Sequence, residues 1–191
     1  MTTEPATVSE VNAPLEAGTW TIDAAHTLVE FSVRHMTIAR VTGRFGAVNG
    51  TVQVPADNPL AATVTASIDV TSVSSGHPKR DELIRSADFL DAENFPVMTF
   101  ISEHAVPGPQ GHWRIPGQLT IKNVSRPVEL DAVFGGLIQH RGAVRAGFSA
   151  TTEIGRKDFG VSWNAALDAG GAIVSDAVRI SLEVELVRAD A

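Results

Sequence analysis

Cysteine is absent from the 191 residues, so the chain has no disulfide, no reactive thiol and no zinc–thiolate site. Concentrated positive charge is missing as well. The 15 Lys and Arg residues occur singly or in pairs among 22 acidic residues, and the net charge of −7 excludes an electrostatic surface for nucleic acid. No apolar run is long enough to span a bilayer, so we expect no integral membrane segment.

The first 17 residues contain neither a basic residue nor an apolar run, so they do not have the pattern of a secretory signal. Their Thr, Glu, Pro and Ser content is typical of a loose segment. We therefore expect a flexible N-terminal tail over residues 1–17, a single domain over residues 18–191, and a cytoplasmic location. A chain of this length buries a sizeable core.

Motifs for catalysis and metal binding are also missing. There is no Gly-x-Ser-x-Gly elbow for a nucleophile and no glycine-rich phosphate loop. The six histidines never stand two or four residues apart, the spacings at which ligands converge on a strand or a helix. Asp88 and Asp91 are better explained as caps of a short helical turn. The sequence predicts no catalytic residue, no metal and no cofactor.

What the chain does contain is alternation of apolar and polar residues, the pattern of half-buried strands. The clearest expected buried faces are Ala62, Val64, Ala66, Ile68 and Val70 in one segment, and Val178, Ile180, Leu182, Val184 and Leu186 in another. Near Phe100 two faces compete, because Val97, Thr99 and Ile101 are as apolar a set as Met98 and Phe100. Turn residues separate these alternating runs. Counting the runs predicts about eight strands, joined mostly by short antiparallel hairpins.

Eight antiparallel strands that bury one face close into a barrel, which removes the exposed sheet edges. A sandwich is the alternative. The small residues expected on the inner face favour a barrel with room for one ligand, because a filled core would need bulk there. These small residues are Gly43, Gly117, Ala132, Ala146 and Ala150.

One segment departs from the strand pattern. Pro78 suits an early helical position, Asp81 and Glu82 suit a helix N-terminus, and Pro96 stops the segment. We expect a short helical insert near residues 77–92. Its apolar side needs a surface to rest on, so we expect Leu83, Phe89 and Phe95 to pack over one mouth of the barrel as a lid.

Several motifs occur together over residues 18–187. They are Trp20-x-Ile22-Asp23-x-x-His26, Phe31-x-Val33-x-His35, Gly43-x-Phe45, the run from Arg80 to Asp91, Phe95-Pro96, Gly117-x-Leu119-Thr120-Ile121, Pro127-Val128 and Arg156-x-Asp158-Phe159-Gly160. In this order they resemble the YceI-like family of lipocalin-like polyisoprenoid-binding proteins. The resemblance implies an extended eight-stranded antiparallel barrel with a helical insert and an apolar tunnel for a long-chain lipid.

The expected function is therefore non-enzymatic binding, storage or transport of a polyisoprenoid, an isoprenoid quinone or a fatty-acyl lipid. The expected ligand contacts are Phe31, Val33, Phe45, Leu83, Phe89, Phe95, Phe100, Leu119, Phe134, Phe148, Phe159 and Trp163. Polar head-group contacts are expected from His35, Arg80 and Arg85. The two arginines have a second interpretation, a structural network in which Asp81 pairs with Arg85 while Arg80 binds loop carbonyls.

Two other functions stay open. One is an enzyme that acts on a small hydrophobic substrate through His35 or His26. The other is a scaffold barrel whose outer surface binds another protein. A long-chain lipid is the expected partner, and the sequence leaves a homodimer open.

Overall fold

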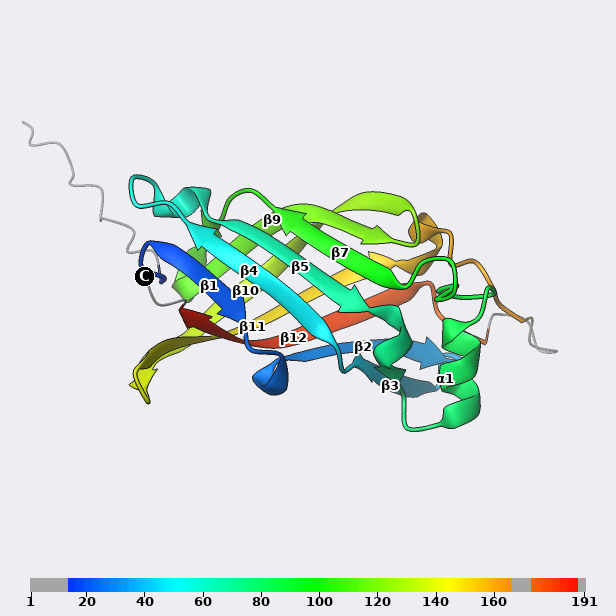
Figure 1. Cartoon of the computed structure of the whole chain (residues 1–191). Helices are drawn as coiled ribbons and strands as arrows, with labels where there is room; N and C mark the ends of the chain where they lie inside the picture. Colours follow the sequence, from blue (N-terminus) through cyan, green and yellow to red (C-terminus); the bar gives the residue numbers. More distant parts are fainter. Residues whose placement is uncertain (1–13, 166–172, 189–191) are drawn as a thin grey trace, which may run out of the picture.

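The computed structural model describes residues 14–165 and 173–188. One antiparallel sheet closes on itself to form an elongated barrel (Figure 1). Its strands among these residues are β1 (Gly18–Ile22), β2 (Leu28–His35), β3 (Ala39–Phe45), β4 (Val48–Val54), β5 (Thr63–Asp69), β6 (Val73–Ser74), β7 (Val97–Ser102), β8 (Val106–Pro107), β9 (His112–Ile121), β10 (Val124–His140), β11 (Ala143–Gly155) and β12 (Ala177–Arg188).

These segments fill eight positions around the barrel. Strands β1 and β2 both pair with β12, so together they form one interrupted strand. Likewise β3 and β4 share the next position, where β3 pairs with β2 and β4 with β1, and β5 and β6 share the one after. Strands β7, β9, β10, β11 and β12 follow in order, and the pairing of β12 with β1 closes the ring. The predicted eight-stranded antiparallel barrel is confirmed, and the sandwich is excluded.

A short 3-10 helix interrupts the first strand position. In this helix, η1 (Ala24–His26), the carboxylate of Asp23 accepts a hydrogen bond from the Ala25 N–H (3.0 Å). Aspartate favours this role because its short side chain satisfies a backbone donor at a helix start. Other 3-10 helices among the described residues are η2 (Pro59–Ala61), η3 (Val70–Ser72), η4 (Pro109–Gly111) and η5 (Arg156–Phe159).

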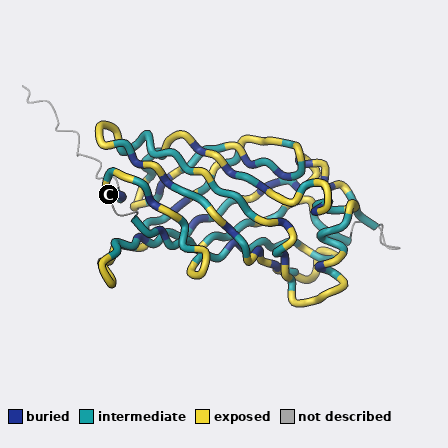
Figure 2. The backbone as a smooth tube through the Cα atoms, viewed as in Figure 1, coloured by how far each residue is buried: buried dark blue, intermediate teal, exposed yellow. Residues whose placement is uncertain are grey.

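Exposed and buried positions alternate along the strands (Figure 2). The expected inner residues of β5 and β12 do face the interior. At β7 the structure resolves the competition, because Met98 and Phe100 are buried whereas Val97 and Ile101 are 46% and 49% exposed.

Two inward glycines provide space for a neighbouring aromatic ring. A Cβ atom on Gly43 would lie 2.4 Å from Cζ of Phe31, its cross-strand partner, and one on Gly117 would lie 2.5 Å from Cζ of Phe100. Glycine in a strand commonly marks such a close approach. Contrary to the expectation from the sequence, these glycines therefore leave no room for a ligand, since aromatic rings already fill their space.

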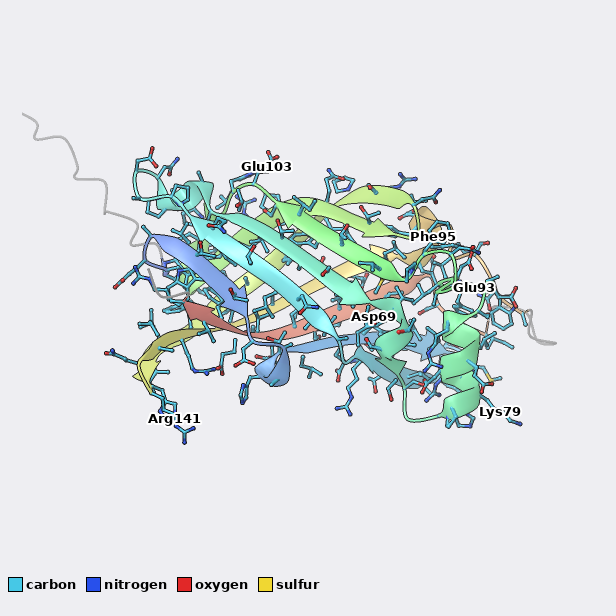
Figure 3. The ribbon with its side chains drawn as sticks, viewed as in Figure 1. Asp69, Lys79, Glu93, Phe95, Glu103 and Arg141 are labelled. Carbon is cyan, nitrogen blue, oxygen red and sulfur yellow. The ribbon has the colours of Figure 1, made fainter. Side chains whose placement is uncertain are left out.

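The helical insert is α1 (Pro78–Arg85), followed by turns to Asn94. It lies at one end of the barrel, and Lys79 on it points away from the sheet (Figure 3). The tip of the β10–β11 hairpin, marked by Arg141, lies at the opposite end. No helix among the described residues is both long and apolar enough for a membrane crossing.

Residues 1–13 of the expected tail lie outside the described residues. The rest of it contacts the barrel. Leu15 is buried beside Trp20, whose indole Nε1–H donates to the Glu16 carbonyl (3.0 Å). Arg188 at the end of β12 pairs with the Glu16 carboxylate.

Candidate functional site

A cavity of about 620 Å³ occupies the barrel interior. All eight strand positions contribute to its wall, and the wall residues are mostly Val, Ile, Leu, Ala and Phe. The volume falls within the range of about 300–1,000 Å³ that is typical of small-molecule sites. An apolar wall supplies no hydrogen bonds, so an occupant gains free energy mainly by leaving water.

Few polar residues contribute to the wall of this cavity. Those in its wall are Thr27, Glu30, His35, Arg80, His104, Thr152 and Arg156. His35, Arg80 and Arg156 belong to the end of the barrel near α1, which we call the helix end. The backbone of His35 forms an isolated antiparallel β-bridge with Val174. The carbonyl of Val174 accepts a hydrogen bond from Arg156 (3.4 Å). Three of the seven polar wall residues thus gather at the helix end, an arrangement that suits a ligand with a long apolar tail and a small polar head.

The insert and a neighbouring loop cover the helix end. Leu83 and Ile84 of α1 and Phe89 of the following turn line the cavity there. The ring of Phe89 packs on Trp163, with 5.1 Å between the ring centroids. Both rings thus lie between the cavity and the outside.

At the opposite end, residues before β1 and from two loops line the cavity. Pro14, Leu15, Pro59 and Ala105 reach it here, with Trp113 of β9. The Ala105 N–H donates to the Leu60 carbonyl (2.9 Å), which ties the two loops together. Trp20 is fully buried next to Leu15.

The sequence model of the YceI-like domain family matches residues 20–186, which is most of the chain. A UPF0312 protein of Shewanella baltica is 38% identical over 167 residues, which cover 87% of this chain and 84% of that protein. The chain belongs to the YceI-like family.

Solved structures agree with this assignment. A Campylobacter jejuni YceI protein is 26% identical, with a TM-score of 0.69 over 82% of this chain and 90% of that one. A Saccharophagus degradans protein, described as a polyisoprenoid binding domain implicated in plant cell wall breakdown, shares the fold at 14% identity. Its TM-score is 0.65, over 89% of this chain and 98% of that one.

Within this YceI-like barrel, nine of the twelve expected ligand contacts line the cavity. They are Phe31, Val33, Phe45, Leu83, Phe89, Phe100, Leu119, Phe148 and Trp163. Phe148 also packs on Phe134, which lies outside the wall, with 5.2 Å between ring centroids. Contact of any of them with a ligand stays a prediction.

Three expected contacts lie outside the cavity wall. Phe134 is one of them. Phe95 is half-buried on the outside of the barrel end, where its ring centroid is 5.9 Å from Nζ of Lys122. Phe159 is buried in η5, in the core behind the wall. The lid over the helix end therefore consists of Leu83 and Phe89 without Phe95.

The arginines of the insert take part mainly in a structural network. Arg85 lies outside the cavity wall and donates to the carbonyls of Thr71 and Val73 (both 3.1 Å). Arg80 donates from Nε to the Ser75 hydroxyl and from Nη2 to the Ser75 carbonyl (both 2.7 Å). Asp81 is buried and accepts the Ser75 N–H (2.7 Å), and the hydrogen bonds from Ser75 lower the pKa of this carboxyl. The expected pairing of Asp81 with Arg85 is replaced by pairing with Ser75.

Arg156 is the most deeply buried of the polar wall residues that the sequence did not predict as contacts, although it stands in a motif of the resemblance. Its side chain is almost fully buried and donates to the carbonyls of Val161 and Trp163 (both 2.7 Å) and of Ser175 (2.9 Å). Burial lowers the pKa of its guanidinium. Arg156 thereby holds the two loops of the helix end together, a role that depends on tertiary contacts and has no local sequence pattern.

A second polar cluster lies at the break between β1 and β2. Asp23, His26 and Glu185 bring ligand atoms within 4.8 Å of one another, a spacing that a metal ion could use. The guanidinium of Arg145 contacts the carboxylates of both Asp23 (2.8 Å) and Glu185, so it supplies the positive charge at this point. The hydrogen bond from Arg145 and a second from His26 lower the pKa of Asp23 to about 2. This cluster fastens the interrupted strand to β11 and β12.

Proposed function

We propose that the barrel binds one long-chain apolar lipid, of the polyisoprenoid, isoprenoid quinone or fatty-acyl type, and stores or carries it without chemical change. The observation that supports this most strongly is the interior cavity of about 620 Å³ with its mostly apolar wall. Membership of the YceI-like family adds support, as does the shared fold of a domain described as polyisoprenoid binding.

The free energy of such binding would come from burying hydrocarbon. Each methylene removed from water contributes roughly 0.8 kcal/mol, so an isoprene unit contributes on the order of 3 kcal/mol before ordering costs. Measured affinities do not exceed about −20 kcal/mol, so the gain from a long chain cannot accumulate without limit. The cavity would then select its lipid by length and shape more than by total affinity.

We place the polar head of the lipid at the helix end. His35 and Arg80 face the cavity there. The hydrogen bonds of Arg80 to Ser75 use Nε and Nη2, and its Nη1 makes none to another described residue. Arginine nitrogens suit phosphate or carboxylate oxygens, and imidazole suits a quinone or alcohol oxygen. The predicted head-group role of Arg85 finds no support in its position outside the wall.

Catalysis has less support than binding. The cavity histidines are His35 and His104, and among the described residues neither has a carboxylate within 4.0 Å of its ring, whereas His26 and His112 do. A catalytic histidine is usually oriented by such a partner. The expected cytoplasmic location stays a prediction.

Titration with a fluorescent fatty acid and a fluorescent prenyl alcohol tests the proposed function. Ala66 lines the cavity, and its neighbour Thr65 is exposed on the outer face of β5. Ala66→Phe should weaken saturable binding at least tenfold, because the added ring takes up cavity volume. Thr65→Phe adds the same ring outside and should bind like the parent protein. Binding that is absent from the parent, or equal in both variants, would refute an interior site.

A further inference from the structure

The turn between β2 and β3 has an unusual backbone. Its central residues Met36 and Thr37 both have positive φ values, 52° and 62°. The Ile38 N–H closes the turn by donating to the His35 carbonyl (3.2 Å). Turns of this kind normally use asparagine and glycine, and a β-branched threonine in this region is an outlier. Backbone strain of this type is found most often at functional sites.

Two large apolar side chains project from this turn. Ile38 is 82% exposed, more than any other large hydrophobic residue among those described, and Met36 is 37% exposed. The patch is far smaller than the roughly 1,000 Å² that a stable protein interface requires. Its size suits shallow insertion between lipid head groups better than docking of a folded partner.

Positive charge flanks the apolar turn. Arg34 and Arg40 are direct cross-strand partners on the outer face, an arrangement of like charges that destabilises a hairpin. Neither has a carboxylate within 4.0 Å among the described residues, and Arg44 continues the same face opposite Glu30. Residues 34–44 contain three arginines and no acidic residue, although the chain as a whole carries a net charge of −7.

The hairpin is held firmly at the mouth of the cavity. The Met36 N–H donates to the Ile173 carbonyl (2.8 Å), and the backbone of Arg34 bonds to Ser175. Arg156 in turn holds the Ser175 carbonyl. On the inner face of the same strand, Val33 and His35 line the cavity. The exposed apolar turn therefore lies next to the end through which we expect a lipid to pass (Figure 1).

We propose that residues 34–40 dock the helix end of the barrel onto an anionic lipid bilayer. Met36 and Ile38 insert among the head groups, while Arg34 and Arg40 contact lipid phosphates. The positive local charge and the apolar tip both complement such a surface. This inference rests on the proposed function, because it supplies the membrane contact through which a carrier would exchange its lipid.

Co-sedimentation with vesicles tests the docking. We expect the protein to bind vesicles of phosphatidylcholine and phosphatidylglycerol (7:3), to bind pure phosphatidylcholine much more weakly, and to dissociate as salt rises. Arg34→Gln with Arg40→Gln should weaken binding roughly 25-fold, because each cation near an anionic surface contributes about fivefold. Ile38→Ser should weaken it about tenfold through lost apolar burial.

The opposite hairpin provides a matched control. Leu137 and Ile138 are 46% and 63% exposed near the tip of β10–β11, and replacing both with serine should leave vesicle binding unchanged. The proposal would be overturned if this control lost as much vesicle binding as Ile38→Ser, or if the protein showed no preference for anionic vesicles. It would also be overturned if the protein self-associated and Ile38→Ser abolished that self-association.

Uptake of the fluorescent fatty acid, added without vesicles, separates this proposal from the proposed function. Variants that lose vesicle binding and keep uptake support docking by the hairpin. Parent protein that binds anionic vesicles through the hairpin but takes up no lipid would refute the interior site and leave the docking intact. Parent protein that takes up lipid but ignores vesicles would refute the docking alone.

Discussion

The ring of Phe31 lies over the backbone of Gly43, its cross-strand partner, so closely that a Cβ atom on the glycine would be 2.4 Å from Cζ. Phe31 also packs on Phe45, with 5.6 Å between ring centroids. The glycine thus lets an aromatic ring lie flat against the cavity wall. This relationship sets how far Phe31 extends into the space that a ligand would use.

Gly43→Ala should force the Phe31 ring into the cavity. We expect a loss of about 1–3 kcal/mol in unfolding free energy, as for other overpacked sites, together with weaker binding of the fluorescent lipids. Urea unfolding measures the first effect. Gly147→Ala is the control, because a Cβ there meets nothing within 4 Å. If the double variant Phe31→Leu with Gly43→Ala is no more stable than Gly43→Ala alone, the contact does not act as described.

Phe89→Ala should remove part of the lid. Because lipid or water can fill the gap, we expect a loss of only about 1–2 kcal/mol in stability, less than the 3–5 kcal/mol of an ordinary core phenylalanine. The dissociation rate of a fluorescent lipid, followed by stopped-flow, should rise about tenfold. Phe134 packs on Phe148 in a similar aromatic pair but lies outside the cavity wall itself, so Phe134→Ala should leave that rate unchanged. A large stability loss with an unaltered rate would make Phe89 ordinary core.

Arg156→Lys should loosen the helix end, since a single ammonium cannot reach the carbonyls that the planar guanidinium spans. Carbonyls left buried without partners should lower the unfolding free energy by about 2–4 kcal/mol. Amide exchange should speed up at Met36 and Ser175, whose N–H groups bond across this region. Arg126→Lys, on the exposed surface, should change stability by less than about 0.5 kcal/mol. If amide exchange at Met36 and Ser175 is unchanged in Arg156→Lys, Arg156 does not hold the helix end together.

Asp23 should make the barrel sensitive to acid. Its folded-state pKa of about 2 lies below its ordinary value of 3.8, so the stabilisation is complete above about pH 4 and is lost as the pH falls toward 2. Arg145→Met should raise the Asp23 pKa, measured by carboxyl NMR, and should lower the urea midpoint more at pH 7 than at pH 2.5. Arg114→Met removes an exposed arginine 4.0 Å from Glu129 and should change neither the Asp23 pKa nor the pH dependence of the urea midpoint. Equal midpoint losses at both pH values would show that Arg145 does not act through this pair.

The sequence predicted the barrel well because its signal is local. Strict alternation placed Ala66 and Leu182 on the inner face without any knowledge of their partners. The prediction from sequence was weakest where the position of a residue depends on contacts between segments that are distant in the chain. Phe95 and Phe134 are as apolar as Phe89 and Phe100, and only the tertiary path of the chain places them outside the wall. Arg156 could not be assigned either, because its carbonyl partners lie on loops that meet only in the folded chain.

Native mass spectrometry of protein purified without detergent tests lipid binding in the barrel most directly. We expect close to one lipid per chain, with an unbranched or isoprenoid tail, which organic extraction removes and which is depleted in Ala66→Phe but retained in Thr65→Phe. A chain that carries no lipid and takes none up from a bacterial lipid extract would contradict a lipid-binding interior.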